Sequence, residues 1–234
     1  MREKHPGPVR LVCVHGAGAG GWEWGIWARV FGARGYAVLA PDLAPGEAGL
    51  VATRFADYRD QVLAWCRAVP PPRTLIGASL GGLLSLSVAE DAGAAALVLV
   101  NPMPPAGIAV PPAGEPARAA VIRWRSTRTL AGTRRAMPDA DDAARAYAFR
   151  RWRDESGAVL DAARAGVGIA APRCPVLILA SEHDTDIPAE TSRALADRLG
   201  ADFELIAQAS HVGPLLGRSA ARSAERVCDW LAGC

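Results

Sequence analysis

The protein has 234 residues, of which 50% are hydrophobic and 21% are charged, and its formal net charge is +2. This length suits one α/β domain with an insertion. A nucleic-acid partner has little support, because no basic stripe with interleaved aromatic residues lies outside residues 106–171. A membrane span is excluded because apolar runs such as Ala94 to Val100 are strand-sized, far below the ~20 residues that a span needs. The N-terminus lacks the apolar core of a signal peptide, so we expect a cytoplasmic protein.

The cysteines indicate neither a disulfide framework nor a zinc site. They are odd in number, widely spaced and free of any C-x-x-C pattern. We expect no metal, and the reaction inferred below implies no organic cofactor. The five residues are Cys13, Cys66, Cys174, Cys228 and Cys234.

The first part of the chain reads as a strand, a glycine-rich loop, a helix and a second strand. The β-branched run from Val9 to Val14 predicts a buried strand, which enters the loop from His15 to Trp22. A helix from about Trp24 to Arg34 and a buried strand from Tyr36 to Ala40 follow. The glycine spacing in the loop is G-x-G-x-G-G, which departs from a dinucleotide-binding fingerprint.

The next segments repeat this alternation. An amphipathic helix is predicted over Phe55 to Ala68, then a strand from Thr74 to Ile76, a helix to about Asp91 and a strand from Ala95 to Val100. Alternating strands and helices at this spacing predict a parallel sheet with helices on both faces.

The alternation stops after residue 105 and returns near residue 172. Between these points the sequence predicts helical pieces at Pro116 to Ser126, Asp139 to Asp154 and Gly157 to Ala165, with no convincing strand. We interpret this insertion as a helical cap over the carboxyl edge of the sheet, where open α/β sheets bind ligands. The predicted domains are a core of residues 1–105 and 172–234 and a cap of residues 106–171.

After the insertion the chain completes the sheet. We predict a strand from Pro175 to Ala180, a helix from Ala189 to Leu199, a strand from Asp202 to Ile206 and a closing helix from Ala220 to Leu231. The whole chain then has a compact, mostly parallel sheet of about six strands.

The motif Gly77-Ala-Ser-Leu-Gly81 joins a predicted strand directly to a predicted helix. A sharp strand-to-helix turn of the G-x-S-x-G type exposes its serine, and glycines are needed where side chains would collide with the neighbouring strand and helix. The sequence thus offers Ser79 as a nucleophile. The ordinary alternative is a βα turn of small residues in a chain rich in alanine and glycine.

A serine hydroxyl needs an imidazole to take its proton and an acid to orient that imidazole. His211, in the loop after the last predicted strand, lies on the same sheet edge as Ser79 and fits the chain order serine, acid, histidine. Three acids follow the Pro175 strand, and we place Asp184 first with Asp186 in reserve, because Glu182 is nearer the strand end and would need a different loop path. Either aspartate also suits an ordinary turn.

Two backbone N–H groups are needed to hold the negative charge that develops on the attacked carbonyl oxygen. The Leu80 N–H lies at the start of the helix after Ser79. The second donor should come from the loop after the first strand, where Ala17 is our choice and Gly18 the alternative.

The segment His15-Gly-Ala-Gly-Ala-Gly-Gly-Trp-Glu-Trp24 resembles the H-G-A-x-x-G-G-W-x-W loop of the plant methylesterase and hydroxynitrile-lyase branch of the α/β-hydrolase superfamily and its bacterial relatives. The resemblance extends over nearly the whole chain except the cap. It implies an α/β-hydrolase fold with nucleophile, acid and base at Ser79, Asp184 and His211. The other matching segments are Ala40-Pro-Asp-Leu43, Gly77-Ala-Ser-Leu-Gly81, Asn101-Pro-Met-Pro104, Ser181-Glu-His-Asp184 and Ser210-His211.

Two positions bear on which reactions of the superfamily the resemblance can imply. The lyases have a lysine after the catalytic histidine, whereas Val212 stands there in this chain, which disfavours cyanohydrin cleavage. Ser79 in place of an aspartate argues against the dehalogenase and epoxide-hydrolase branches.

Substrate contacts are expected near the loop, the nucleophile and the cap. Arginines outnumber acidic residues in the cap, which would suit a phosphate-bearing or carrier-linked acyl group, although arginine replaces lysine in all but Lys4 and a solvated surface explains the excess better. The candidates for substrate binding are Gly18, Trp22, Met103, Trp124 and Trp152.

The sequence favours a serine hydrolase that cleaves a small carboxylic ester or thioester through an acyl-enzyme. One alternative is a biosynthetic thioesterase, acyl-transfer or cyclisation catalyst with the same triad. The other is a non-enzymatic ligand-binding protein on the same fold, because one fold can host unrelated functions.

Overall fold

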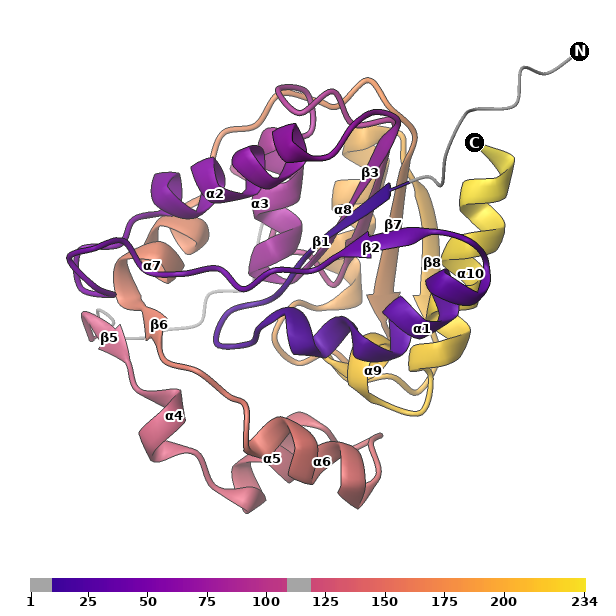
Figure 1. The fold of residues 1–234 in the computed structure, drawn as a ribbon. Helices are drawn as coiled ribbons and strands as arrows, with labels where there is room; N and C mark the ends of the chain where they lie inside the picture. Colours follow the sequence, from indigo (N-terminus) through magenta and orange to yellow (C-terminus); the bar gives the residue numbers. More distant parts are fainter. Residues whose placement is uncertain (1–9, 109–118) are drawn as a thin grey trace, which may run out of the picture.

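The aliphatic runs of the sequence form the six strands of one parallel sheet, in the order β2-β1-β3-β4-β7-β8 (Figure 1). The structure is a computed structural model that describes residues 10–108 and 119–234. The predicted six-stranded sheet with helices on both faces is confirmed. The strands are β1 (Arg10–Val14), β2 (Ala37–Leu39), β3 (Arg73–Ala78), β4 (Ala96–Val100), β7 (Val176–Ser181) and β8 (Asp202–Ile206).

Alternate residues of each central strand face two different cores. Leu97 and Leu99 of β4 face one hydrophobic cluster, whereas Val98 and Val100 face the other. The first cluster packs under helices α2 (Phe55–Ala68), α3 (Leu80–Val88) and α8 (Ala189–Leu199). The second packs under α1 (Gly25–Ala33), α9 (Gly213–Leu216) and α10 (Ala220–Gly233).

The prediction that the second strand is buried is wrong. β2 pairs with β1 alone and forms one edge of the sheet, so Leu39 is 38% exposed. A strand with a neighbour on one side only cannot be covered as completely as β3 or β4.

The insertion is called the insert below, for its described residues 119–171. It contains α4 (Trp124–Thr127), α5 (Leu130–Ala136), α6 (Asp142–Phe149) and α7 (Gly157–Ala165), together with β5 (Val121–Ile122) and β6 (Glu155–Ser156). The two short strands pair in antiparallel fashion, with Val121 opposite Ser156 and Ile122 opposite Glu155. In Figure 1, α4, α5 and α6 lie beyond the carboxyl edge of the main sheet.

The insert corrects two of our predictions. The expectation of no strand is wrong because β5 and β6 exist, and two residues are too few to show a strand period. The helix predicted over Pro116 to Ser126 is wrong at Val121 and Ile122, which form β5, whereas α4 covers its last three residues. Its first residues lie outside the described ranges. The helix predicted over Asp139 to Asp154 shortens to α6.

Other boundaries agree closely with the sequence. α2, α7 and α8 begin and end at the predicted residues, and the closing helix extends two residues further, to Gly233. The helix after Ser79 ends earlier than predicted, at Val88, and the short α5 and α9 were not predicted. Among the described residues, none of the helices is long and apolar enough to cross a bilayer.

Candidate active site

The turn between β3 and α3 holds Ser79 in a rare backbone conformation, with φ 51° and ψ −118°. A non-glycine residue with positive φ is strained and persists only where the surroundings hold it. The glycines around it allow the close approach that the turn requires. A Cβ on Gly77 would lie 2.2 Å from the Gly81 carbonyl oxygen, and a Cβ on Gly81 would lie 2.2 Å from the Val14 carbonyl oxygen. The predicted steric role of both glycines is confirmed.

His211 and Asp184 form a short contact at the carboxyl edge of the sheet. The His211 Nδ1 lies 2.6 Å from Asp184 Oδ2, and the Asp184 side chain is fully buried. The other carboxylate oxygen, Oδ1, accepts the N–H groups of Asp186 at 2.8 Å and Ile187 at 2.9 Å. The structure therefore brings Asp184 to the imidazole, whereas Asp186 contributes a backbone donor that holds Asp184 in place.

The surroundings of His211 favour its protonated form. Burial of the ring acts to lower its pKa, but the hydrogen bond and negative charge of Asp184 outweigh burial and raise the pKa above its ordinary value. An imidazole with this partner can accept a proton on Nε2 while Nδ1–H stays directed at the carboxylate.

Asn101, at the end of β4, connects three segments of the site. Its Nδ2 donates to the Ser181 Oγ at 2.8 Å and to the His211 carbonyl oxygen at 2.6 Å, and its Oδ1 accepts the Ser181 N–H at 2.8 Å. Asn101 is 2% exposed and has a φ of 44°. The side chain thus fixes the loop of His211 against β4 and β7. The sequence showed Asn101 only as part of a matching segment.

Ser79 and His211 border the same cavity, which has a volume of about 50 Å³. Among the described residues, the Ser79 hydroxyl makes no direct hydrogen bond to His211; such catalytic contacts commonly tighten only when substrate binds. The cavity is mainly apolar. It is lined by Gly16, Ala17, Ala19, Glu23, Ala78, Ser79, Val100, Trp152, His211, Val212 and Leu215.

Two backbone N–H groups near Ser79 are left without acceptors within the described ranges. Leu80 is the first residue of α3, so its N–H has no partner within the helix. The Ala17 N–H belongs to the glycine-rich loop, and Ala17 lines the cavity. The neighbouring N–H groups are occupied, since Gly16 donates to Glu23 and Gly18 donates to Glu155.

Glu23 is a buried acid that the sequence analysis did not single out. It lies in the 3-10 turn η1 (Gly21–Trp24), is 3% exposed and accepts the Gly16 N–H at 2.9 Å. Burial raises the pKa of its carboxyl group to about 8, against the lowering effects of the Gly16 hydrogen bond and the His211 charge. Glu23 is therefore mostly uncharged near pH 7.

His15 shapes the glycine-rich loop through two hydrogen bonds. Its Nδ1–H donates to the Gly16 carbonyl oxygen at 2.8 Å, and its Nε2 accepts the Leu43 N–H at 2.8 Å. Because burial lowers its pKa to about 4, His15 stays neutral, which the accepting Nε2 requires.

The residues predicted to bind substrate separate into two groups. Trp152 lines the cavity beside Ser79, but Gly18, Trp22, Met103 and Trp124 do not. Trp22 stacks edge-on against Trp152 at 5.4 Å, Met103 lies in the core under α3, and the Trp124 ring covers Gly18. These four residues therefore do not border the cavity in this arrangement, although Trp22 contacts Trp152, which does.

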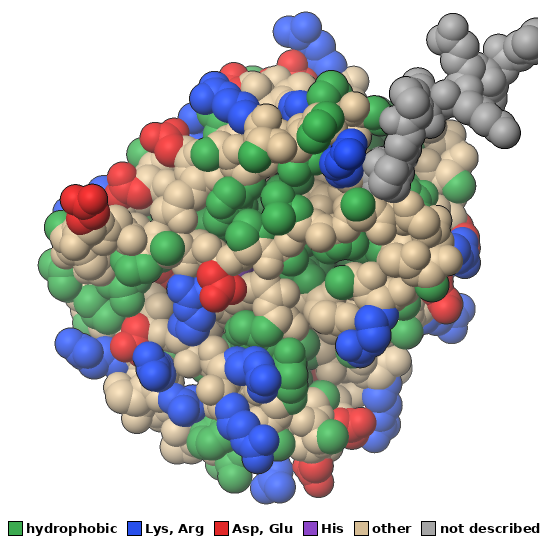
Figure 2. Space-filling model, viewed as in Figure 1, with side chains coloured by type: hydrophobic (Ala, Val, Ile, Leu, Met, Phe, Trp, Pro, Cys, Tyr) green, Lys and Arg blue, Asp and Glu red, His purple; other side chains and the backbone are tan. Residues whose placement is uncertain are grey.

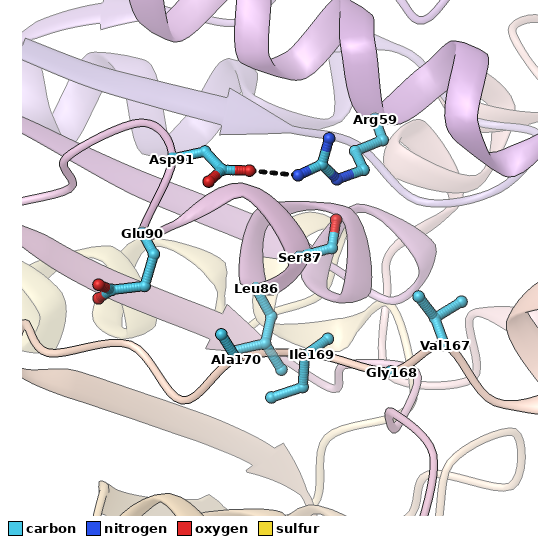
Figure 3. A pocket seen from close by; sticks show the side chains of 9 residues that line it. All are labelled: Arg59, Leu86, Ser87, Glu90, Asp91, Val167, Gly168, Ile169 and Ala170. Carbon is cyan, nitrogen blue, oxygen red and sulfur yellow. Dashed lines mark hydrogen bonds and ion pairs between the residues drawn. The ribbon is translucent and has the colours of Figure 1, made fainter.

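A second cavity, of about 220 Å³, lies away from Ser79 between α2, the end of α3 and the segment after α7. Figure 3 shows the Arg59 guanidinium turned toward the Asp91 carboxylate, to which it is paired. The charge of Arg59 is already neutralised by Asp91, and none of the predicted site residues lines this cavity. We therefore do not place the active site there. Its lining residues are Arg59, Leu86, Ser87, Glu90, Asp91, Val167, Gly168, Ile169 and Ala170.

The arginines of the insert lie mainly on its surface. Figure 2 shows basic side chains gathered over the lower part of this face, where Figure 1 places α4, α5 and α6. The exposed ones in the described insert include Arg123, Arg125, Arg134, Arg135, Arg150 and Arg151. In the part of the chain that the structure describes, no cluster of three histidine, cysteine or acidic side chains could hold a metal ion.

Comparison with solved structures shows the same fold in several esterases and related enzymes. A pyrethroid hydrolase from Sphingobium faniae is 21% identical, with a TM-score of 0.72 over 95% of this chain and 96% of its own. A methylesterase from Arabidopsis is 14% identical, with a TM-score of 0.73 over 94% and 98%. Tomato methylketone synthase I is 14% identical, with a TM-score of 0.75 over 96% and 98%.

At these identities the likeness shows the fold, and sequence comparison adds the family. No curated protein sequence matches the chain significantly. Residues 11–228, however, match the family described as the Alpha/beta hydrolase family, which spans every strand of the main sheet from β1 to β8 apart from Arg10. Because residues 11–228 match this family and the sheet has the order described above, the chain belongs to the alpha/beta hydrolase family.

Proposed function

We propose that this protein is a serine hydrolase that cleaves a small carboxylic ester or thioester through an acyl-enzyme. One observation carries the proposal: the strained Ser79 borders the same cavity as His211, whose Nδ1 lies 2.6 Å from the buried Asp184. In this proposal the insert acts as a cap over that cavity.

The proposed reaction has two halves. The Ser79 Oγ attacks the carbonyl carbon while His211 Nε2 takes the hydroxyl proton, and the Ala17 and Leu80 N–H groups hold the oxyanion. Collapse of the tetrahedral intermediate breaks the bond to the leaving alcohol or thiol, which receives the proton from His211. Water, deprotonated by His211, then attacks the acyl-enzyme, and the carboxylic acid leaves as Ser79 regains its proton.

A burst assay tests the proposal directly. A panel of p-nitrophenyl esters and acyl thioesters is mixed with stoichiometric amounts of the protein and of Ser79→Ala, and the first turnover is followed. We expect a burst with one equivalent of p-nitrophenol in the native protein and none in the variant. A fluorophosphonate should label the native protein alone.

The same assay separates the alternatives. A native protein with no burst, no turnover and no fluorophosphonate label would contradict the hydrolase proposal and favour a ligand-binding role. A burst followed by faster release to an added alcohol or amine than to water would instead indicate acyl transfer.

A further inference from the structure

Two buried carboxyl groups hold the peptide that carries the proposed oxyanion donor. Glu23 accepts the Gly16 N–H at 2.9 Å, and Glu155 accepts the Gly18 N–H at 3.1 Å. Each acid is 3% exposed. Ala17 lies between the two bound amides, so the direction of its own N–H is set from both sides.

The two acids come from different parts of the molecule. Glu23 belongs to the core, seven residues after Gly16, whereas Glu155 belongs to the insert and is 137 residues from Gly18 in the sequence. The insert thus supplies one of the two groups that orient this loop.

Further contacts join the insert to Gly18. The Arg153 N–H donates to the Gly18 carbonyl oxygen at 2.7 Å, so both polar groups of the Gly18 backbone are bound by residues 153–155. The third side is closed by Trp124, because a Cβ on Gly18 would lie 2.3 Å from its ring. The Arg153 guanidinium also donates to the Leu43 carbonyl oxygen at 2.6 Å.

Glu155 is itself held rigidly. Its Oε1 accepts the Tyr58 hydroxyl at 2.9 Å and the Ser156 N–H at 2.8 Å, while its Oε2 remains for Gly18. Next to it, the Ser156 hydroxyl donates to the Thr53 carbonyl oxygen at 2.9 Å. Three donors on one buried carboxyl group, including one from α2, leave it little freedom to turn away from the loop.

We propose that Glu155 is a positioning residue which, together with Glu23, fixes the Ala17 N–H as an oxyanion donor, so that a side chain of the insert sets the direction of a donor in the core. This inference rests on the proposed function. An oxyanion donor acts through its fixed direction, and a glycine-flanked peptide without external partners would lose that direction.

The test compares Glu155→Ala and Glu155→Gln with the native protein, using the best ester from the burst assay and a trifluoromethyl ketone with the same acyl group. The ketone forms a tetrahedral adduct with Ser79 whose oxyanion needs the same donors. We expect kcat to fall by about 10- to 100-fold with little change in KM, and the inhibition constant of the ketone to rise by a similar factor. All values are normalised to the active fraction from end-point fluorophosphonate labelling.

Asp141→Ala is the matched control, because it removes the N-cap hydrogen bond of α6 in the insert but leaves the contacts of Glu155 and Gly18 unchanged. It should stay close to the native kcat even if its melting temperature falls. Glu155 variants with kcat and ketone inhibition within threefold of native values would overturn the positioning role while leaving Ser79 chemistry intact. Absence of Ser79-dependent turnover in the native protein would overturn the proposed function instead.

A second pair of variants covers the case in which Glu155→Ala fails to fold. Glu23→Gln keeps an oxygen that can accept the Gly16 N–H, whereas Glu23→Ala does not. We expect Glu23→Gln to retain at least about tenfold more activity than Glu23→Ala. Equal activity in both would contradict the role of the two acids.

Discussion

At the scale of single residues, the contact between His211 and Asp184 gives the clearest prediction. Asp184→Asn keeps an oxygen for the Asp186 and Ile187 N–H groups but places an amide against the imidazole, which favours the wrong tautomer. We expect kcat to fall about 10³- to 10⁴-fold with a small change in KM. Steady-state kinetics with the best ester measures both values.

The neighbouring aspartate is the control for this prediction. Asp186 contributes its backbone N–H, so Asp186→Asn should change kcat by less than about threefold. A larger loss of kcat in Asp186→Asn than in Asp184→Asn would mean that Asp186, and not Asp184, is the acid that orients His211.

Glu23 predicts how stability varies with pH. Its pKa is raised from 4.5 to about 8, so the native state keeps a proton between these values that the unfolded chain releases. The free energy of unfolding should therefore fall as pH rises through this window, by roughly 2 to 4 kcal/mol from this group. Glu23→Gln should remove that contribution. The stability of the variant relative to the native protein should therefore increase between pH 5 and pH 8.

Urea unfolding at both pH values measures the effect. The difference between the two proteins isolates Glu23 from His15, whose lowered pKa acts at the acid end. A difference that is the same at pH 5 and pH 8 would show that Glu23 ionises normally in the folded protein.

At the scale of elements, the space around two helix glycines predicts opposite effects of alanine, because α3 approaches β1 closely at Gly81 whereas α1 is open at Gly32. Gly81→Ala would place a methyl group against the Val14 carbonyl oxygen, so we expect a loss of about 3 kcal/mol or more in unfolding free energy. Gly32→Ala in α1 meets no atom within 4 Å and should stabilise the protein by about 0.4–1 kcal/mol. Thermal and urea unfolding of both variants decides this, and equal effects would refute the steric account.

The elements also show what a sequence can predict. α2, α7 and α8 carry their signals locally, in apolar spacing and end residues, and their bounds were predicted correctly. β5 and β6 have two residues each, and they form because Val121 and Ile122 meet a partner more than thirty residues away. The edge position of β2 likewise depends on the order of strands, which no local pattern contains.

The residues of the candidate site also differ in whether a local sequence pattern reveals them. Ser79, Asp184 and His211 each follow a recognisable strand, so chain order alone brought them to one sheet edge. Glu155 escaped notice because its role depends on Gly18, a contact between the insert and the first loop. Glu23 lies in the segment from His15 to Trp24 that matches the superfamily loop, but its burial depends on how η1 packs, which the sequence does not show.

At the scale of the whole molecule, the small cavity beside Ser79 predicts a preference for short acyl groups. Its volume of about 50 Å³ admits roughly four water-sized groups, which suits acyl chains of about two to four carbons. We expect kcat/KM for p-nitrophenyl acetate or butyrate to exceed that for the octanoate by at least about tenfold.

Trp152 forms the insert side of this cavity, so Trp152→Ala should move the optimum toward longer chains. An octanoate preference in the native protein would mean that the insert opens well beyond the arrangement described above.

The position of Asn101 has a consequence for the ageing of the protein. Asparagine side chains commonly convert to aspartate when the backbone nitrogen of the next residue attacks the side-chain amide and closes a ring. The next residue here is Pro102, whose nitrogen carries no hydrogen and is already part of a ring. The amide that joins β4 to the His211 loop is therefore protected from this route of deamidation, and storage should not convert Asn101 to aspartate by ring closure with its neighbour.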